Sequence, residues 1–394
     1  MLDLASLSLY PATKEQLVET RKRSFAEWAR GLSLEQYLQR DAFMDGLVHA
    51  KNGHLTTWIL APRNNPSTLD FECACETYLR KGIIATPGSP DASSVSCYGI
   101  ASVFTPAHKR KRGSARHMMR LLHWVMAPRA DLPKFPSAWG SPPPPSSEGN
   151  AKFSALYSDI GVDFYHQSGP RDIKSEGWLS VGAISTVWET SSPSLSHTLE
   201  NDQHQWELLD HEAVEMLWNS DIPAMENDLI KMSKSCGQTC FAFLPSGGVG
   251  AFQVHRAATM IPDGSPVPRM DHWGVVLANS NEEPKTFATW TIDDFNQAKI
   301  PTLLITRMRA TSATLPSLMR RINRVIWEDA KKPGATRIEA WNLPVELELV
   351  ASELGGKTEE RSEHLPSFKW YGDGKEESVK WLFNEKCVYH SVIT

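Results

Sequence analysis

The sequence predicts an α+β protein with a mixed, mainly antiparallel sheet flanked by helices, and a second domain of similar order. Two observations predict this fold class. In the first half, strand-like segments alternate with helices in the order strand, two helices, three strands, helix, strand, helix and strand. Such an order mixes adjacent strands with helical crossovers, whereas a doubly wound parallel sheet would use crossovers throughout. The second half has strands, a long helix, a strand and a short helix, and 394 residues are enough for two domains.

Capping and breaking residues bound the elements of the first half. Thr13, with Gln16 three residues later, and then Ser33 are expected to begin two helices. Alternating apolar and polar residues predict a strand from Leu69 to Leu79. The remaining expected elements are strands at 7–10, 55–60, 96–104, 153–158 and 178–188, and helices at 113–127 and 162–167.

A polar, serine-rich stretch marks the expected domain boundary, which divides the chain into residues 1–195 and 196–394. The second domain is expected to contain helices at 208–218, 315–330 and 345–354, and strands at 239–244, 273–278, 285–292, 303–308 and 337–341. No clear residue-level repeat accompanies the similar order of the two halves. Residues 131–150 include four consecutive prolines and are predicted to be an insertion or linker outside the core.

Composition excludes several classes of function. The formal net charge of -5 does not indicate a protein that binds nucleic acid through bulk charge. No apolar run approaches the length of a membrane span, and the N-terminus lacks the pattern of a signal peptide. The six cysteines do not show zinc-site spacing. We therefore expect a cytoplasmic protein with no metal, no nucleic-acid partner and no membrane partner.

The segment Arg110-Lys111-Arg112-Gly113-Ser114-Ala115 carries the clearest chemical signal. It follows an expected strand and opens an expected helix, where unpaired backbone N–H groups and the helix dipole favour an anion. The Gly-Lys-Ser/Thr ending of a P-loop and the G-x-G-x-x-G pattern of dinucleotide sites are both absent. Two other interpretations stay open, namely a solvated basic surface and a nuclear targeting string.

In this strand–loop–helix context the pattern Arg110-x-x-Gly113-x-Ala115 resembles the pyrophosphate loop of the GNAT acetyltransferase family. Further segments resemble fungal lysine N-acetyltransferases in particular, namely 58–63, 75–77, 100–106 and 157–165. The resemblance implies a GNAT-like fold in the first domain and acetyl-CoA as co-substrate. It also implies a cofactor strand that separates from its neighbour. The cofactor-binding residues would be Val103, Phe104, Thr105, Arg110, Lys111, Arg112, Gly113, Ser114 and Ala115.

Three residues are candidates for the chemistry of amine acetylation. The resemblance implies that Tyr165 is the acid that protonates the thiolate of coenzyme A; otherwise it is an aromatic core residue. Glu76, on the strand next to the cofactor strand, is the candidate general base, or else a solvated strand residue. Asp159 follows a strand and would hold the amine or orient a water, or else cap the next helix. Asp271 and Trp273 are candidates for substrate binding together with Glu76 and Asp159.

The expected function is therefore transfer of acetyl from acetyl-CoA to a primary amine, with the side-chain amine of free L-lysine implied by the resemblance. The alternatives are acetylation of polyamines or protein lysines, and a catalytically silent scaffold that binds coenzyme A. No Arg-x-x-Gly-x-Gly/Ala pattern precedes the long helix of the second half. We therefore expect that half to be a degenerate GNAT-like domain that completes the substrate pocket without binding cofactor.

Overall fold

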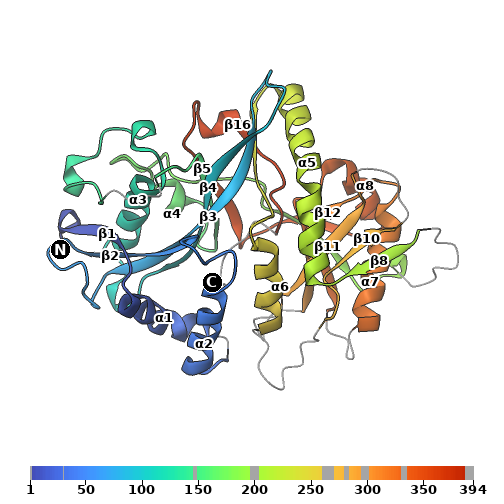
Figure 1. The fold of residues 1–394 in the computed structure, drawn as a ribbon, viewed down its shortest axis with the longest axis horizontal. Coiled ribbons are helices and arrows are strands. Elements are labelled where there is room, and N and C mark those ends of the chain that lie inside the picture. The colour runs from blue at the N-terminus through green and yellow to red at the C-terminus, as the bar shows by residue number, and fades with distance from the viewer. Residues whose placement is uncertain are drawn as a thin grey trace.

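The computed structural model describes residues 2–29, 31–144, 149–195, 204–259, 270–278, 284–293, 301–329 and 335–386. They form two sheets, which Figure 1 shows on the left and the right of the molecule with helices around them. Both sheets are mixed and mainly antiparallel, since parallel pairing occurs at β4–β5, at β9–β16 and at β12–β13. This confirms the predicted fold class.

The first sheet has the order β1-β2-β3-β4-β5-β15-β6, with β9 paired to β3 and β16 paired to β9. Its strands are β1 Leu7–Pro11, β2 Leu55–Pro62, β3 Cys73–Ala85, β4 Ser93–Phe104, β5 Phe153–Ser158, β6 Leu179–Ser180, β9 Thr239–Phe243, β15 Leu365–Trp370 and β16 Val379–Trp381. Three of these strands come from the second half of the chain.

The second sheet has the order β14-β7-β13-β12-β11-β10-β8. Its strands are β7 Ile184–Glu189, β8 Trp206–Leu209, β10 Gly274–Leu277, β11 Phe287–Asp293, β12 Thr302–Arg309, β13 Arg337–Trp341 and β14 Lys357–Glu360. The single strand predicted at 178–188 was wrong, because β6 belongs to the first sheet and β7 to the second. The boundary at residue 195 stays a prediction, and strands from both sides of it contribute to both sheets.

The helices are α1 Lys14–Trp28, α2 Leu34–Asp45, α3 Ser114–Met126, α4 Asp163–His166, α5 His211–Cys236, α6 Val249–Thr259, α7 Leu315–Asp329 and α8 Val345–Glu353. Both predicted caps are confirmed: Thr13 with Gln16, and Ser33 with Gln36, form capping boxes. The prediction at 208–218 was partly wrong, because residues 206–209 form β8 and the helix then runs to Cys236. Among the described helices, none is long and apolar enough to cross a membrane.

Alternate residues of the strands pack on opposite faces of the first sheet. Trp58 and Leu60 belong to the core cluster that also contains Met118 and Leu122 of α3. Ile59 and Ala61 belong to a different cluster on the other face. Figure 1 shows α3 and α4 on one side of this sheet and α1 and α2 on the other. Side chains from both faces of the first sheet can therefore take part in a reaction at β3 and β4.

The proline-rich segment is partly a core element, contrary to the prediction. Trp139 is buried in the same cluster as α3, and Phe135 packs edge-on against Trp124 of that helix, with ring centroids 4.8 Å apart. Arg63 donates a 2.6 Å hydrogen bond to the carbonyl of Ser141. Aromatic side chains and one arginine thus dock the described part of this segment on the first sheet.

Candidate active site

Two neighbouring strands of the first sheet separate to form a fork. Parallel β4 and β5 pair at Cys97–Phe153, Tyr98–Ser154 and Gly99–Ala155, and at no later residue of these two fully described strands. From there β5 keeps its other neighbour, β15, along its whole length. The end of β4 therefore has backbone groups on its β5 side that are not paired with β5. The separation implied by the family resemblance is confirmed.

A bulge lies on β4 at the open part of the fork. Ala74 of β3 pairs with Phe104, and Glu76 pairs with Ala101, so that one residue of β3 faces two of β4. Ser102 in the bulge has a φ of 54°, which is uncommon for a residue other than glycine. Its hydroxyl donates a 2.7 Å hydrogen bond to Oε2 of Glu76. The bulge thus directs Ser102 toward the candidate base.

The loop after β4 presents an open helix N-terminus. Gly113 caps α3 with a φ of 85°, a left-handed conformation that glycine adopts without steric cost. The first backbone hydrogen bond of α3 runs from His117 N to Gly113 O over 3.0 Å, so the N–H groups of residues 114–116 precede the intrahelical ladder. These N–H groups, with the helix dipole, are suited to a phosphate.

The basic side chains of this loop hold its backbone in place. Arg110 Nε donates to the carbonyl of Thr105 over 2.8 Å, and Arg112 donates to the carbonyl of His108 over 3.0 Å. Buried Lys109 binds Glu72, and the hydroxyl of Ser114 donates to the same carboxylate. The structure therefore brings the predicted cofactor residues together at the fork and assigns the arginines a role in shaping the loop.

Glu76 lines a pocket on the α1 and α2 side of the sheet. The pocket is open to solvent, and the space of about 600 Å³ at this place includes part of that solvent. Its lining includes Arg21 of α1, Asp41 and Asp45 of α2, and Phe252 of α6. Burial raises the pKa of the Glu76 carboxyl above its ordinary value, while the Ser102 hydrogen bond opposes this shift. Glu76 is therefore a better proton acceptor than an exposed glutamate.

Tyr165 lies on the opposite face of the sheet, in the core cluster that includes α3. It belongs to the short helix α4 and is 7% exposed. Burial raises the pKa of its hydroxyl, and the charge of Asp159 adds to this effect. The hydroxyl therefore stays protonated at neutral pH, as an acid must before it donates. Tyr165 and Glu76 thus lie on different faces of the first sheet.

The other three candidates do not line the Glu76 pocket. Asp159 accepts hydrogen bonds from the backbone N and from Nδ1 of His364, at 2.7 and 2.8 Å. The N-cap residue of α4 is Val162, whose side chain makes no hydrogen bond. Trp273 is buried in the core of the second sheet, while Asp271 is exposed near the start of β10. Their roles in substrate binding stay predictions.

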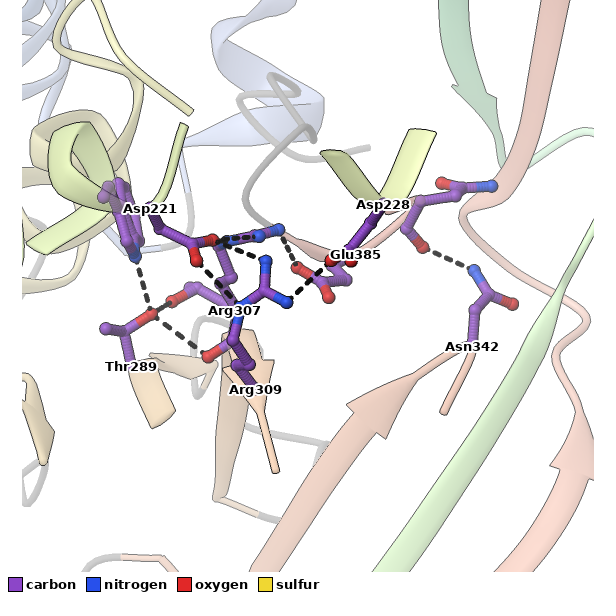
Figure 2. A network of polar contacts seen from close by, with 10 residues as sticks. Asp221, Asp228, Thr289, Arg307, Arg309, Asn342 and Glu385 are labelled. Carbon is purple, nitrogen blue, oxygen red and sulfur yellow. Dashed lines mark hydrogen bonds and ion pairs between the residues drawn. The ribbon is translucent and has the colours of Figure 1, made fainter. Parts of the chain in front are cut away.

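The second sheet contains a fork of its own, which Figure 2 shows to hold an ionic network. Parallel β12 and β13 pair from Thr302–Arg337 to Ile305–Ala340, and β12 then continues to Arg309. Arg307 and Arg309 bind Asp221 of α5, and Arg307 also binds Glu385 over 3.1 Å. Burial raises the pKa of Glu385, an effect that Arg307 opposes. The first fork lies next to the glycine-capped N-terminus of α3. The second fork instead binds the segment of the same chain that carries Glu385.

Sequence reasoning missed the residues that share the pocket with Glu76. Asp41 and Asp45 lie one turn apart on α2, a spacing that would have shown two acids on one helix face. No local pattern connects them to Arg21, His49 or Phe252, which come from other elements. Within the described residues, no three His, Cys, Asp or Glu side chains are grouped in a way that could hold a metal ion.

Comparison with solved structures identifies the architecture. A GCN5-related N-acetyltransferase from Kribbella flavida matches with a TM-score of 0.51 and 12% identity, covering 93% of this chain and 72% of that one. A probable N-acyltransferase from Enterococcus faecalis V583 matches with a TM-score of 0.53 and 9% identity, also covering 93% and 72%. At these identities the likeness shows the fold. The forked sheet with its glycine-capped helix is thus the fold of the GNAT class.

The sequence itself identifies the family. Residues 189–390, just over half of the chain, match the GNAT_LYC1-like model, described as the LYC1 GNAT-like C-terminal domain. This chain therefore belongs to the LYC1-like GNAT family. A lysine acetyltransferase of Yarrowia lipolytica (strain CLIB 122 / E 150) is 28% identical over 106 residues, which are 27% of this chain and 26% of that protein.

Proposed function

We propose that this protein transfers the acetyl group of acetyl-CoA to a primary amine, and that the acceptor is the side-chain amine of free L-lysine. The observation that carries the proposal is the arrangement of the fork, the open N-terminus of α3 and the acidic pocket around Glu76. Family membership and the partial likeness to a lysine acetyltransferase support the same activity.

In this proposal the loop and the end of β4 bind acetyl-CoA. The N–H groups of residues 114–116 donate hydrogen bonds to the pyrophosphate, and Arg110 and Arg112 keep that loop in shape through their bonds to backbone carbonyls. Val103, Phe104 and Thr105 lie on the part of β4 that β5 leaves unpaired. Their backbone groups would hold the pantetheine arm and the thioester carbonyl.

Glu76 and Tyr165 then divide the proton transfers. A lysine side chain has a reference pKa of about 10.4 and arrives as an ammonium ion. Glu76 takes a proton from it, and the amine nitrogen attacks the thioester carbonyl. The C–N bond forms, the C–S bond breaks, and Tyr165 gives its proton to the leaving thiolate. The acylated nitrogen releases its remaining extra proton to solvent, and Tyr165 regains a proton from solvent. The roles fit their surroundings, since burial raises the pKa of both groups.

Steady-state release of coenzyme A with a panel of amines tests the proposal. L-lysine, spermidine and a lysine-containing peptide should each be offered with acetyl-CoA, and the products identified by mass spectrometry. We expect turnover of L-lysine with a mass gain of one acetyl group. Turnover of spermidine or the peptide without turnover of lysine would contradict the proposed acceptor. Binding of acetyl-CoA without turnover of any amine would indicate a silent scaffold.

A further inference from the structure

The pocket beside Glu76 is lined by an ion pair between Arg21 and Asp45. Arg21 Nη2 lies 2.8 and 2.6 Å from the two carboxylate oxygens of Asp45, and Arg21 Nε lies 3.5 Å from Asp41 Oδ2. The side chains of Arg21 and Asp45 are 11% and 32% exposed, and both line the pocket. Among the described residues, the contacts of Arg21 use Nε and Nη2 and none uses Nη1. One face of the pair is thus available to a molecule in the pocket.

We infer that Arg21 and Asp45, together with His49, bind the α-carboxylate and α-ammonium groups of a free amino acid whose side-chain amine reaches Glu76. This inference rests on the proposed function and names the residues that select the acceptor. An arginine next to a carboxylate offers a positive and a negative group side by side, which is the complement of a zwitterion.

The charges of the pocket agree with this acceptor. Asp41, Asp45 and Glu76 line it as carboxylates, and Arg21 lines it as a cation. Arg40 also binds Asp41, with Nε at 2.8 Å. These groups together carry one net negative charge when all are ionised. Lysine at neutral pH carries one net positive charge, so the filled pocket is neutral.

His49 supplies an independent sign of a ligand. It lines the pocket, it is 4% exposed, and its Nδ1 has no hydrogen-bond partner among the described residues. Burial lowers the pKa of His49 to about 4, with Arg80 contributing, so that the ring is neutral. Buried polar atoms are nearly always hydrogen-bonded, and an unpaired one inside a pocket indicates a ligand group that completes it.

Residues from both halves of the chain hold His49 in this position. Its ring packs against Phe252 of α6, with centroids 4.8 Å apart, and stacks on Tyr78 at 6.0 Å. A side chain at Gly248, just before α6, would lie 2.9 Å from the backbone N of His49. The close approach of α6 thus places the imidazole. This gives the second half a specific part in the acceptor pocket.

Other acceptors match this arrangement less well. A polyamine has no anionic group for Arg21, and its second ammonium would lie close to that cation. A lysine within a protein has amides in place of its charged α-groups, so the ion pair would be buried without a complement. The pocket therefore favours a free basic amino acid.

A matrix of substrates and variants tests the inference. The substrates are L-lysine, cadaverine, which lacks the α-carboxylate, and 6-aminohexanoate, which lacks the α-ammonium. The variants are Arg21→Met and Asp45→Asn, with Lys22→Met as the control, because Lys22 is an exposed cation on the same helix. Release of coenzyme A gives kcat/KM for each pair, and acetyl-CoA affinity and thermal melting verify that each variant is folded.

For the unchanged protein we expect kcat/KM for lysine to exceed that for each analogue by about tenfold or more. Arg21→Met should lower the value for lysine by at least that factor, and should lower the value for cadaverine far less. Asp45→Asn should lower the value for lysine and spare 6-aminohexanoate. Lys22→Met should change none of these ratios.

The outcomes separate the inference from the proposed function. Equal kcat/KM for lysine and cadaverine in the unchanged protein would overturn the zwitterion site while leaving the acetyltransferase proposal intact. A parallel loss for all substrates in Arg21→Met, in a folded variant that binds acetyl-CoA, would show that Arg21 acts only in packing α1 on α2. That result would also overturn the inference. No turnover of any amine would contradict the proposed function itself.

Discussion

The hydroxyl of Ser102 lies 2.7 Å from Oε2 of Glu76 and donates its proton to that carboxylate. Ser102 reaches it because the β4 bulge places this residue in a left-handed conformation beside β3. The phenol of Tyr78 donates to the same oxygen over 3.1 Å. The carboxylate that we propose as general base is therefore oriented by two hydroxyls at the edge of the pocket that we propose for the acceptor.

Replacing Glu76 by Gln removes the proposed base while it keeps the shape of the side chain. We expect kcat/KM for lysine to fall by about 10²- to 10⁴-fold, with acetyl-CoA affinity unchanged.

The pH dependence of activity tests the same residue. Burial raises the pKa of Glu76 above its ordinary value of 4.5, and the base must be deprotonated, so activity should decline as the pH falls through this raised pKa. Ser102→Ala removes a hydrogen bond that lowers the pKa and should move this acid limb to higher pH. If the acid limb of Ser102→Ala lies at the same pH as that of the unchanged protein, the assignment of Glu76 as the base is contradicted.

Replacing Tyr165 by Phe removes a single hydroxyl from the core. If Tyr165 protonates the leaving thiolate, kcat should fall by about 10²-fold or more while the KM for acetyl-CoA stays the same. Tyr371→Phe is the matched control, because Tyr371 is a buried phenol of the same core cluster whose hydroxyl contacts His123. The control should lose about 1 kcal/mol of stability and keep its kcat. Full activity of Tyr165→Phe would exclude the acid role.

Gly113 tests the proposed phosphate site. Alanine at its φ of 85° is strained by roughly 1–2 kcal/mol, and relaxation of the loop would turn the N–H groups of residues 114–116 away. We expect the Kd of acetyl-CoA, measured by calorimetry, to rise by about tenfold, which corresponds to about 1.4 kcal/mol. Gly88 has the same φ of 85° in the β3–β4 connection, and a Cβ there would meet nothing within 4 Å. Gly88→Ala should therefore lose similar stability without any change in acetyl-CoA affinity. If Gly88→Ala and Gly113→Ala change the affinity equally, the loop at Gly113 is not the phosphate site.

His123 makes the stability of the fold depend on pH. It stacks on Trp178 with ring centroids 4.2 Å apart and contacts the Tyr371 hydroxyl at 2.7 Å. Burial lowers its pKa from 6.5 to about 3. Because the folded pKa is depressed, the unfolded chain takes up a proton below pH 6.5 that the folded chain does not, and stability is lost as the pH falls.

Urea unfolding of the native protein and of His123→Gln at pH 7.5 and 5.5 measures this contribution. The difference in unfolding free energy between the two proteins should shrink by about 1.4 kcal/mol at the lower pH. Comparing the two proteins cancels the titration of all other groups. A difference that does not change with pH would mean that His123 keeps its ordinary pKa in the folded state, and a difference that grows at the lower pH would mean that its folded pKa is raised.

Local features of the fold were predictable because they depend on neighbours in the chain. Thr13 and Ser33 cap their helices through residues three positions later, and Gly113 begins α3 as its pattern indicates. Longer-range features were not predictable in this way. The strand predicted at 178–188 divides between two sheets, and β15 joins β5 from more than 200 residues further along the chain. Hydrophobic periodicity shows that a face is buried and carries no information on which partner covers it.

The sequence alone determined the elements of the proposed cofactor loop, since Arg110, Gly113 and Ala115 lie within one short segment whose strand–loop–helix context is itself local. Tertiary structure decided the rest of the site. It separated β4 from β5, set Glu76 and Tyr165 on opposite faces, and turned Asp159 toward His364. It also gathered Arg21, Asp45, His49 and Phe252 around Glu76. Such a pocket depends on the packing of α1, α2 and α6 against one sheet, and residues distant in sequence carry no local signal of that packing.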